Sequence, residues 1–388
     1  MDNKLKLCGD YTTWSNVPFE DIVDRVSAQK KSSNLPYVEF EDIISGEGIL
    51  NKNIYERHNV KNGIYFVKGD VLFGKLRPYL KNILLANFNG IAVGDFWVLR
   101  SHRVLPYILY LVVNSNKFMR IANISSGSKM PRSDWAIVSK AMITIPESTE
   151  EQQKIASYFQ SLDSLIQTTS KELASLKQIK TASLQSMFPQ EGKTVPKVRF
   201  KGFEGEWEKI PFGSFLKESY ERSTVENEDI LLSSAITGVY LNSELFGHQR
   251  GASNIGYKKI KKNMLILSAQ NLHLGNANVN LRFEHGLISP AYKVYEIVNI
   301  SPLFLQQWIK MDSTKVFFLN ATTAGASLCR KNIVWDDLYK QIVLIPSKNE
   351  QVKIGLFFSN LDKQISLQTQ RLEKLKQIKA ACLDKMFV

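Results

Sequence analysis

The stretch EQQKIASYFQSLDSLIQTTSKELASLKQIKTASLQSMF, from Glu151 to Phe188, returns as EQVKIGLFFSNLDKQISLQTQRLEKLKQIKAACLDKMF, from Glu350 to Phe387. The two copies stand 199 residues apart and agree at roughly half of their positions. Both begin with Glu-Gln-x-Lys-Ile, contain a Leu-Asp pair and the run Leu-Lys-Gln-Ile-Lys, and end in Met-Phe. A repeat of this length indicates a chain built from two related halves.

Each copy has the pattern of a long helix with a narrow apolar seam. Apolar side chains recur at alternating steps of four and three residues, which is typical of the a and d positions of a coiled coil. The seam residues are Ile155, Phe159, Leu162, Ile166, Leu173, Leu176, Ile354, Phe358, Leu361, Ile365, Leu372 and Leu375. The flanking positions carry Lys, Glu and Gln, which excludes a membrane span. Two unrelated surface helices are the alternative, but the similarity over several heptads favours helices that pack on each other.

Composition and charge limit the classes of partner and the cellular location that we expect for this chain. The chain has 388 residues, enough for two or three domains, and a net charge of +13 that favours a polyanionic partner, nucleic acid first. No signal peptide, lipidation motif or long apolar run points to a membrane. Cys8, Cys329 and Cys382 lie far apart without a CxxC pair, which predicts a reducing, cytoplasmic location and no zinc site.

The segments around the two helices also repeat. Residues 1–146 and 191–346 each read as a mixed α+β domain with short strands, and a helical stretch follows Pro106 in one and Pro302 in the other. The long helices are assigned to residues 147–190 and 347–388, with a polar linker at 190–197. The fold class is therefore α+β: two mixed domains joined and separated by two long helices, with a pseudo-twofold internal repeat. The domain interiors differ more than the helices do, as expected if each domain binds something different.

Catalytic motifs are missing from this sequence. Residues 251–258 (GASNIGYK) lack the Gly-Lys-Ser/Thr end of a phosphate-binding loop, and residues 34–37 (NLPY) have no glycine-rich cofactor loop beside them. The five histidines have no metal-ligand spacing. The sequence therefore predicts a protein without metal or cofactor that binds and does not catalyse, although a triad assembled only in space would escape this reasoning.

Candidate DNA-binding residues come from basic, polar and aromatic stretches of both domains. Lys and Arg neutralise phosphates, Ser and backbone amides allow close approach to them, and Arg, Asn and Gln read base edges. In the first domain the candidates are Lys75, Arg77, Tyr79, Lys81, Ser128, Lys129 and Arg132. In the second they are Gln249, Arg250, Asn254, Tyr257, Lys258, Lys259, Gln270, Asn271, Ser327, Arg330 and Lys331. A solvated surface charge is the alternative for any one of them.

With these features in view, the chain resembles the specificity subunit of type I restriction-modification systems. The resemblance rests on the two repeated blocks, on residues 68–81 (KGDVLFGKLRPYLK), on the loops at Gly127 and Gly325, and on residues 203–212 (FEGEWEKIPF). It implies that each variable domain is a target-recognition domain for one half of a split, asymmetric DNA sequence. It also implies antiparallel long helices, each of about 38 residues and about 55 Å. Such a pair would act as a ruler of about one and a half DNA turns.

The resemblance also implies a division of labour. Two methyltransferase subunits would bind S-adenosylmethionine and methylate adenine on double-stranded DNA, and motor-nuclease subunits, where present, would use ATP and Mg. This chain would itself be non-catalytic. One alternative is a tandem-domain coiled-coil scaffold without sequence-specific DNA binding. The other is a self-contained methyltransferase or nuclease, against which the missing glycine-rich cofactor loop argues.

Overall fold

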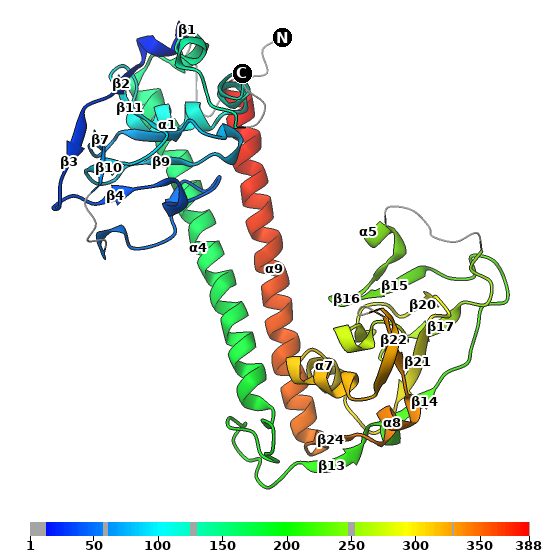
Figure 1. The fold of residues 1–388 in the computed structure, drawn as a ribbon. Coiled ribbons are helices and arrows are strands. Elements are labelled where there is room, and N and C mark those ends of the chain that lie inside the picture. The colour runs from blue at the N-terminus through cyan, green and yellow to red at the C-terminus, as the bar shows by residue number, and fades with distance from the viewer. Residues whose placement is uncertain (1–12, 57–60, 125–129, 247–252, 328–329, 388) are drawn as a thin grey trace. The chain divides into compact units, whose positions relative to one another are not determined.

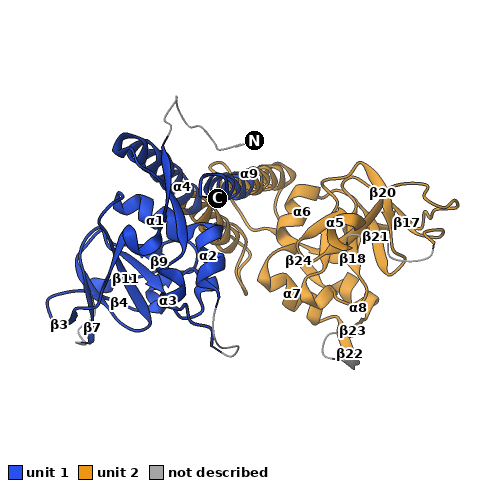
Figure 2. Cartoon of the chain, turned by 90° about the horizontal axis from the view of Figure 1, so that it is seen from above, with its two compact units in different colours: residues 1–170, 370–388 blue, residues 171–369 orange. Residues whose placement is uncertain are grey.

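The computed structural model describes residues 13–56, 61–124, 130–246, 253–327 and 330–387. The chain forms two compact units, one of residues 1–170 and 370–388 and the other of residues 171–369 (Figures 1 and 2). The two long helices, α4 (Thr149–Met187) and α9 (Lys348–Met386), each contribute one part to each unit. The units therefore divide the helices in the middle, and the domain boundaries drawn from the sequence stay a prediction.

The first unit contains two four-stranded sheets and a two-stranded ribbon. The sheet orders are β2-β11-β8-β9 and β3-β7-β10-β4, and β1 pairs with β12. The strands are β1 (Trp14–Pro18), β2 (Val23–Val26), β3 (Gln29–Lys31), β4 (Tyr37–Val38), β5 (Ile43–Ile44), β6 (Ile49–Leu50), β7 (Asn62–Phe66), β8 (Val71–Gly74), β9 (Ile83–Leu85), β10 (Gly90–Ala92), β11 (Phe96–Ser101) and β12 (Met142–Pro146). The short pair β5–β6 stands apart from these sheets.

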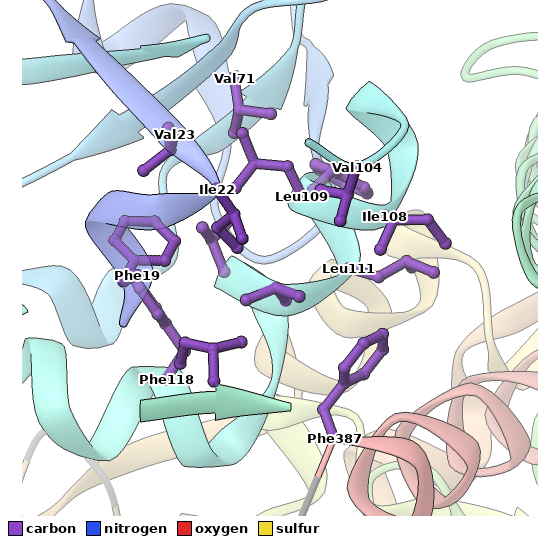
Figure 3. Close-up of a cluster of buried hydrophobic side chains, with 14 of the residues drawn as sticks. Phe19, Ile22, Val23, Val71, Val104, Ile108, Leu109, Leu111, Phe118 and Phe387 are labelled. Atoms are coloured by element: carbon purple, nitrogen blue, oxygen red, sulfur yellow. The ribbon is translucent and has the colours of Figure 1, made fainter. Parts of the chain in front are cut away.

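Helices cover the first sheet and close the core of this unit. They are α1 (Pro106–Asn114), α2 (Asn116–Ala122) and α3 (Trp135–Val138), with the 3-10 turns η1 (Phe19–Asp21), η2 (Phe40–Asp42), η3 (Ile54–Glu56) and η4 (Pro78–Leu80). Pro106 occupies the first turn of α1, where no backbone N–H is needed, and Ser115 caps α2 by accepting a hydrogen bond from the Phe118 amide. Figure 3 shows Phe387, just beyond α9, beside core residues such as Leu111.

The second unit repeats this plan. Its sheets are β14-β21-β18-β19 and β16-β15-β20-β17, and β13 pairs with β24 as β1 pairs with β12. The strands are β13 (Glu208–Pro211), β14 (Leu216–Glu218), β15 (Leu231–Ala235), β16 (Gly238–Leu241), β17 (Lys258–Lys261), β18 (Leu265–Ser268), β19 (Ala277–Val279), β20 (His285–Ile288), β21 (Tyr292–Ile297), β22 (Thr322–Ser327), β23 (Arg330–Ile333) and β24 (Ile342–Ile345). The helices and turns are η5 (Phe212–Phe215), α5 (Asn242–Phe246), η6 (Leu272–Leu274), α6 (Pro302–Ile309), α7 (Asp312–Leu319) and α8 (Trp335–Lys340).

The two units differ at the edges of their second sheets. Both share three strands with the same directions: β10 runs antiparallel to β7 and parallel to β4, and β20 runs antiparallel to β17 and parallel to β15. The fourth strand is β3 beside β7 in the first unit but β16 beside β15 in the second. One scaffold thus carries different edge structures, as the divergent domain sequences predicted.

The long helices pack antiparallel, and the fold class predicted from the sequence is confirmed. In the first unit Ile155 and Phe159, near the start of α4, share an apolar cluster with Leu383 and Met386 at the end of α9. In the second unit the ends are exchanged, because Phe358 near the start of α9 clusters with Met187 at the end of α4. The seam residues are all buried or half-buried. None of the described helices combines the length and the apolar character that a membrane crossing requires.

Each long helix is fastened to its own domain by the glutamine of the repeated Glu-Gln pair. The Gln152 side chain accepts a hydrogen bond from the Leu105 amide and donates one to the Pro146 carbonyl, each at 2.8 Å. Gln351 does the same with the Ser301 amide at 2.8 Å and the Pro346 carbonyl at 2.9 Å. Both glutamines are buried, so their side-chain amides cannot form hydrogen bonds with water. The bonds to the domain satisfy these polar groups, which would otherwise be costly to bury. The pairing explains why Gln recurs here in both copies.

The neighbouring glutamates are satisfied differently in the two units. Glu151 accepts a hydrogen bond from the Trp14 indole N–H at 3.0 Å. Glu350, which is 0% exposed, receives two hydrogen bonds from the Arg199 guanidinium at 2.7 and 2.8 Å. A buried carboxylate needs such a bidentate partner, because a buried charge left unpaired is strongly destabilising.

Candidate nucleic-acid interface

The first-domain candidates lie on the segment that follows strand β8. Pro78 is buried and begins η4, whereas Arg77 before it and Lys81 after it both have left-handed backbone conformations, with φ of 49° and 52°. The Arg77 amide donates to the Pro131 carbonyl at 2.8 Å, and Leu76 pairs with Arg132 in an isolated bridge. The structure therefore brings the segment 75–81 together with Pro131 and Arg132, which follow the loop at Gly127. Ser128 and Lys129 lie outside the described residues.

Charges on this segment fall into two groups. Lys75 and Arg132 share Asp95, with N–O distances of 3.6 and 2.9 Å. Arg77 is exposed and has no ion pair within the described part of the chain. Tyr79 is 56% exposed. Arg77 and Tyr79 are therefore the first-domain candidates that are most available to a ligand.

Tyr79 and Lys81 also line a hollow of about 840 Å³ that the sequence reasoning missed. Its other wall is one face of α2 and its end, formed by Asn116, Lys117, Arg120 and Asn123. The helical stretch after Pro106 was predicted, and the spacing of these polar residues at about one turn could have identified a polar face on it. Asp384 and Phe387, from the end of α9, complete the lining.

In the second domain the basic stretch on β17 differs from the open patch that the sequence suggested. Lys259 pairs with Glu228, Lys261 with Glu221 at 3.4 Å, and Lys262 with Glu284. The Lys259 ammonium holds the pKa of the Glu228 carboxyl below its usual value. Lys258 is 6% exposed, and this burial lowers its pKa. The sequence could not show this neutralisation, because the glutamates reach β17 from segments distant in the chain.

Asn254 needs a correction. We predicted that it reads a base, but the structure buries it to 1% exposure and bonds its side-chain amide in both directions to Asn227, at 2.7 Å each. The Asn254 carbonyl also accepts hydrogen bonds from the Ser223 hydroxyl at 2.6 Å and the Tyr257 amide at 3.2 Å. Asn254 therefore holds a loop together, and Tyr257 beside it is half-buried. Gln249 and Arg250 lie outside the described residues.

The remaining second-domain candidates follow strands that match the first unit. Gln270 and Asn271 come directly after β18, which lies between β21 and β19 as β8 lies between β11 and β9. They thus occupy the place that the segment 75–81 occupies in the first unit, although the sequence placed these candidates separately. Gln270 is exposed, and Asn271 stands at the N-terminus of η6. Ser327, Arg330 and Lys331 lie on the hairpin β22–β23, where the side chain of Lys331 is half-buried and those of the other two are not described.

Comparison with known proteins identifies the domain. Residues 12–178 match the family model of the type I restriction modification DNA specificity domain.

Two solved structures share the fold of this chain. A type I restriction-modification S subunit from M. genitalium covers 100% of this chain and 99% of its own, with 15% identity and a TM-score of 0.63. A chain from a study of complex assembly and conformational transition in the type I R-M system covers 96% of this chain and 97% of its own, with 17% identity and a TM-score of 0.51. At this identity the likeness shows the fold alone. The positions of the DNA contacts stay a prediction.

Proposed function

We propose that the chain is the sequence-specific DNA-recognition subunit of a type I restriction-modification complex and reads a bipartite, asymmetric target. The observation that carries this proposal is the double occurrence of one architecture. The unit around the specificity domain has a candidate segment after β8, and the second unit has its candidates after the matching β18. Two similar scaffolds with different residues at the same place are what two different half-sites require.

The chemistry of the two segments supports different readouts. Gln270 and Asn271 carry amides, which form paired hydrogen bonds with the N6 and N7 atoms of adenine. Arg77 carries a guanidinium, which suits either a phosphate or the O6 and N7 atoms of guanine. The net charge of +13 adds an electrostatic attraction to DNA that does not depend on base sequence.

The proposal gives catalysis to partner subunits. Two methyltransferase subunits with S-adenosylmethionine would methylate adenine in the target, and motor-nuclease subunits using ATP and Mg would join them in a restriction complex. The absence of a glycine-rich cofactor loop in this sequence supports that division.

A map of methylated bases tests this function. A host expresses this chain with its neighbouring methyltransferase subunit, and the control lacks this chain. We expect a new adenine motif made of two short halves around a fixed gap. Exchange of residues 203–346 for the corresponding domain of another specificity subunit should change one half and leave the other.

The same map can contradict the proposal. If the complex assembles in cells and no new motif appears, sequence-specific recognition is wrong and the scaffold function takes its place. Methyl transfer by the purified chain alone would instead revive the self-contained methyltransferase.

A further inference from the structure

The hollow beside η4 in the first unit has the chemistry of an anion site. Lys81 comes from the strained segment after β8, and Lys117 and Arg120 come from α2. None of the three has a carboxylate at ion-pair distance within the part of the chain that is described. Lys75 and Arg132, by contrast, share Asp95. Among the described residues, cations without an ion pair therefore gather around this hollow.

The carboxylate in the lining does not neutralise them. Asp384 accepts a hydrogen bond from the Asn116 amide at 2.6 Å, which fixes one of its oxygens. It favours the charged form of Lys81, but burial outweighs it and lowers the pKa of that lysine, and nearby Lys379 lowers it further. An anion bound in the hollow, in addition to Asp384, would therefore stabilise the charged form of Lys81.

The backbone holds Lys81 in this place at a cost. Arg77 and Lys81 both have left-handed conformations, which cost a non-glycine residue on the order of 1 kcal/mol each and collect at functional sites. The buried ring of Pro78 and the hydrogen bond from the Arg77 amide to Pro131 fix the segment between them. Such a segment presents its side chains with little further loss of conformational freedom.

The other lining groups favour nucleic acid over an acidic protein. Tyr79 carries an exposed hydroxyl, and the side-chain amides of Asn116 and Asn123, which donate to Asp384 and to the Met119 carbonyl at 2.6 Å each, keep a second N–H; hydroxyls and amides are the usual neutral donors to DNA phosphates and sugars. The hollow also continues the segment that carries Arg77. We propose that this hollow binds a backbone phosphate of DNA next to one half-site. The inference rests on the proposed function and adds Lys117 and Arg120 to the candidate interface.

The test measures how DNA binding by the full chain depends on salt. The variant combines Lys117→Gln with Arg120→Gln. The control combines Lys140→Gln with Lys193→Gln, which removes the same charge from two exposed lysines without ion pairs in the described structure. Each protein is titrated with a duplex that carries the mapped target and with a scrambled duplex, at several salt concentrations. Thermal unfolding checks that all of them are folded.

Loss of a phosphate contact should make the negative slope of log K against log salt shallower by about 0.9 and weaken binding roughly tenfold near 0.1 M salt. Both duplexes should be affected alike, because a phosphate contact carries no sequence information. The control should keep the slope of the wild type, apart from the small effect of net charge. Lys117→Arg with Arg120→Lys should restore it.

Other outcomes distinguish failure of the phosphate site from failure of the proposed recognition function. If the wild type prefers its target and the variant keeps the wild-type slope, the phosphate site is wrong while the recognition function stands. If the wild type shows no preference, the recognition function itself fails. If the variant keeps its slope but no longer copurifies with the methyltransferase subunit, the hollow binds protein and the inference is overturned.

Discussion

Lys310, just beyond α6, is a half-buried lysine without a carboxylate partner in the described structure. Its ammonium donates to the Ile236 and Ala277 carbonyls at 2.7 and 3.0 Å and to the Asn278 side-chain oxygen at 2.6 Å. Burial, with a smaller contribution from nearby Lys180, lowers its pKa from 10.5 to about 8. These bonds tie the β15–β16 turn, at the edge where the two units differ, to β19 and α6.

We expect this lysine to make stability depend on pH between about 8 and 10.5. In that range the folded chain loses the Lys310 proton while the unfolded chain keeps it, so the unfolded state binds more protons and the free energy of unfolding rises with pH. The rise should be at most about 3 kcal/mol, because the three acceptors partly favour the charged form. Urea unfolding at pH 8 and pH 10 measures it.

Lys310→Met provides the comparison. Buried tyrosines such as Tyr295, whose pKa is raised, act in the opposite direction above pH 10, but they are common to both proteins. The difference between wild type and variant should therefore rise with pH. Parallel pH curves for the two proteins would show that Lys310 does not titrate in this range.

Single substitutions should also separate base readers from phosphate contacts. We expect Gln270→Ala to relax the preference at one half-site by roughly 1–3 kcal/mol per base and to leave the other half unchanged. Arg77→Ala should weaken binding to all duplexes, and Lys75→Ala should do so less, because Asp95 already neutralises Lys75. Binding to duplexes with each half scrambled in turn measures both effects. Equal loss of preference in the Gln270 and Arg77 variants would contradict the division.

At the scale of elements, the repeated helices form reciprocal ion pairs. The Asp of the repeated Leu-Asp pair on one helix meets the last Lys of the repeated Leu-Lys-Gln-Ile-Lys run on the other. Lys379 lies 2.6 Å from Asp163 in the first unit, and Lys180 pairs with Asp362 in the second. The Tyr107 hydroxyl also donates to Asp163 at 2.6 Å. This Asp and this Lys, which recur in both copies, thus meet across the antiparallel pair.

A charge exchange tests this pairing. Asp163→Lys should destabilise the chain by roughly 1–2 kcal/mol, because it sets two lysines against each other and removes the acceptor of the Tyr107 hydroxyl. Adding Lys379→Asp should recover the part that comes from the charge pair. The double-mutant cycle in urea unfolding isolates that part. A coupling energy near zero would mean that the ion pair contributes no stability.

The sequence predicted the elements that pack against their own repeated copy. The long helices and their antiparallel packing could be predicted, because each seam faces a copy of itself. The ion pairs of the β17 segment could not be predicted, because Lys259, Lys261 and Lys262 meet Glu228, Glu221 and Glu284 only through tertiary packing. The burial of Asn254 escaped for the same reason. Residue type predicts what a side chain can bind, and packing decides whether it is available.

For the whole molecule, the continuous helices make the separation of the half-sites a testable quantity. Each helix has 39 residues, and Ser170 in α4 matches Thr369 in α9 in the repeat. Near this level the Gln368 side chain donates to Glu172 at 3.2 Å. If the antiparallel pair is the ruler, lengthening both helices here should lengthen the gap in the target.

Seven residues inserted after Ser170 and seven after Thr369 would add one heptad to each helix and keep the apolar seam in register. The helices would grow by about 10.5 Å at 1.5 Å per residue, which is about three base pairs of DNA. The methylated-base map should then show both halves unchanged around a gap about three pairs longer. An insertion of two residues in each helix serves as control, because it breaks the seam and should abolish methylation. An unchanged gap in the seven-residue variant would mean that something other than the helix pair sets the spacing.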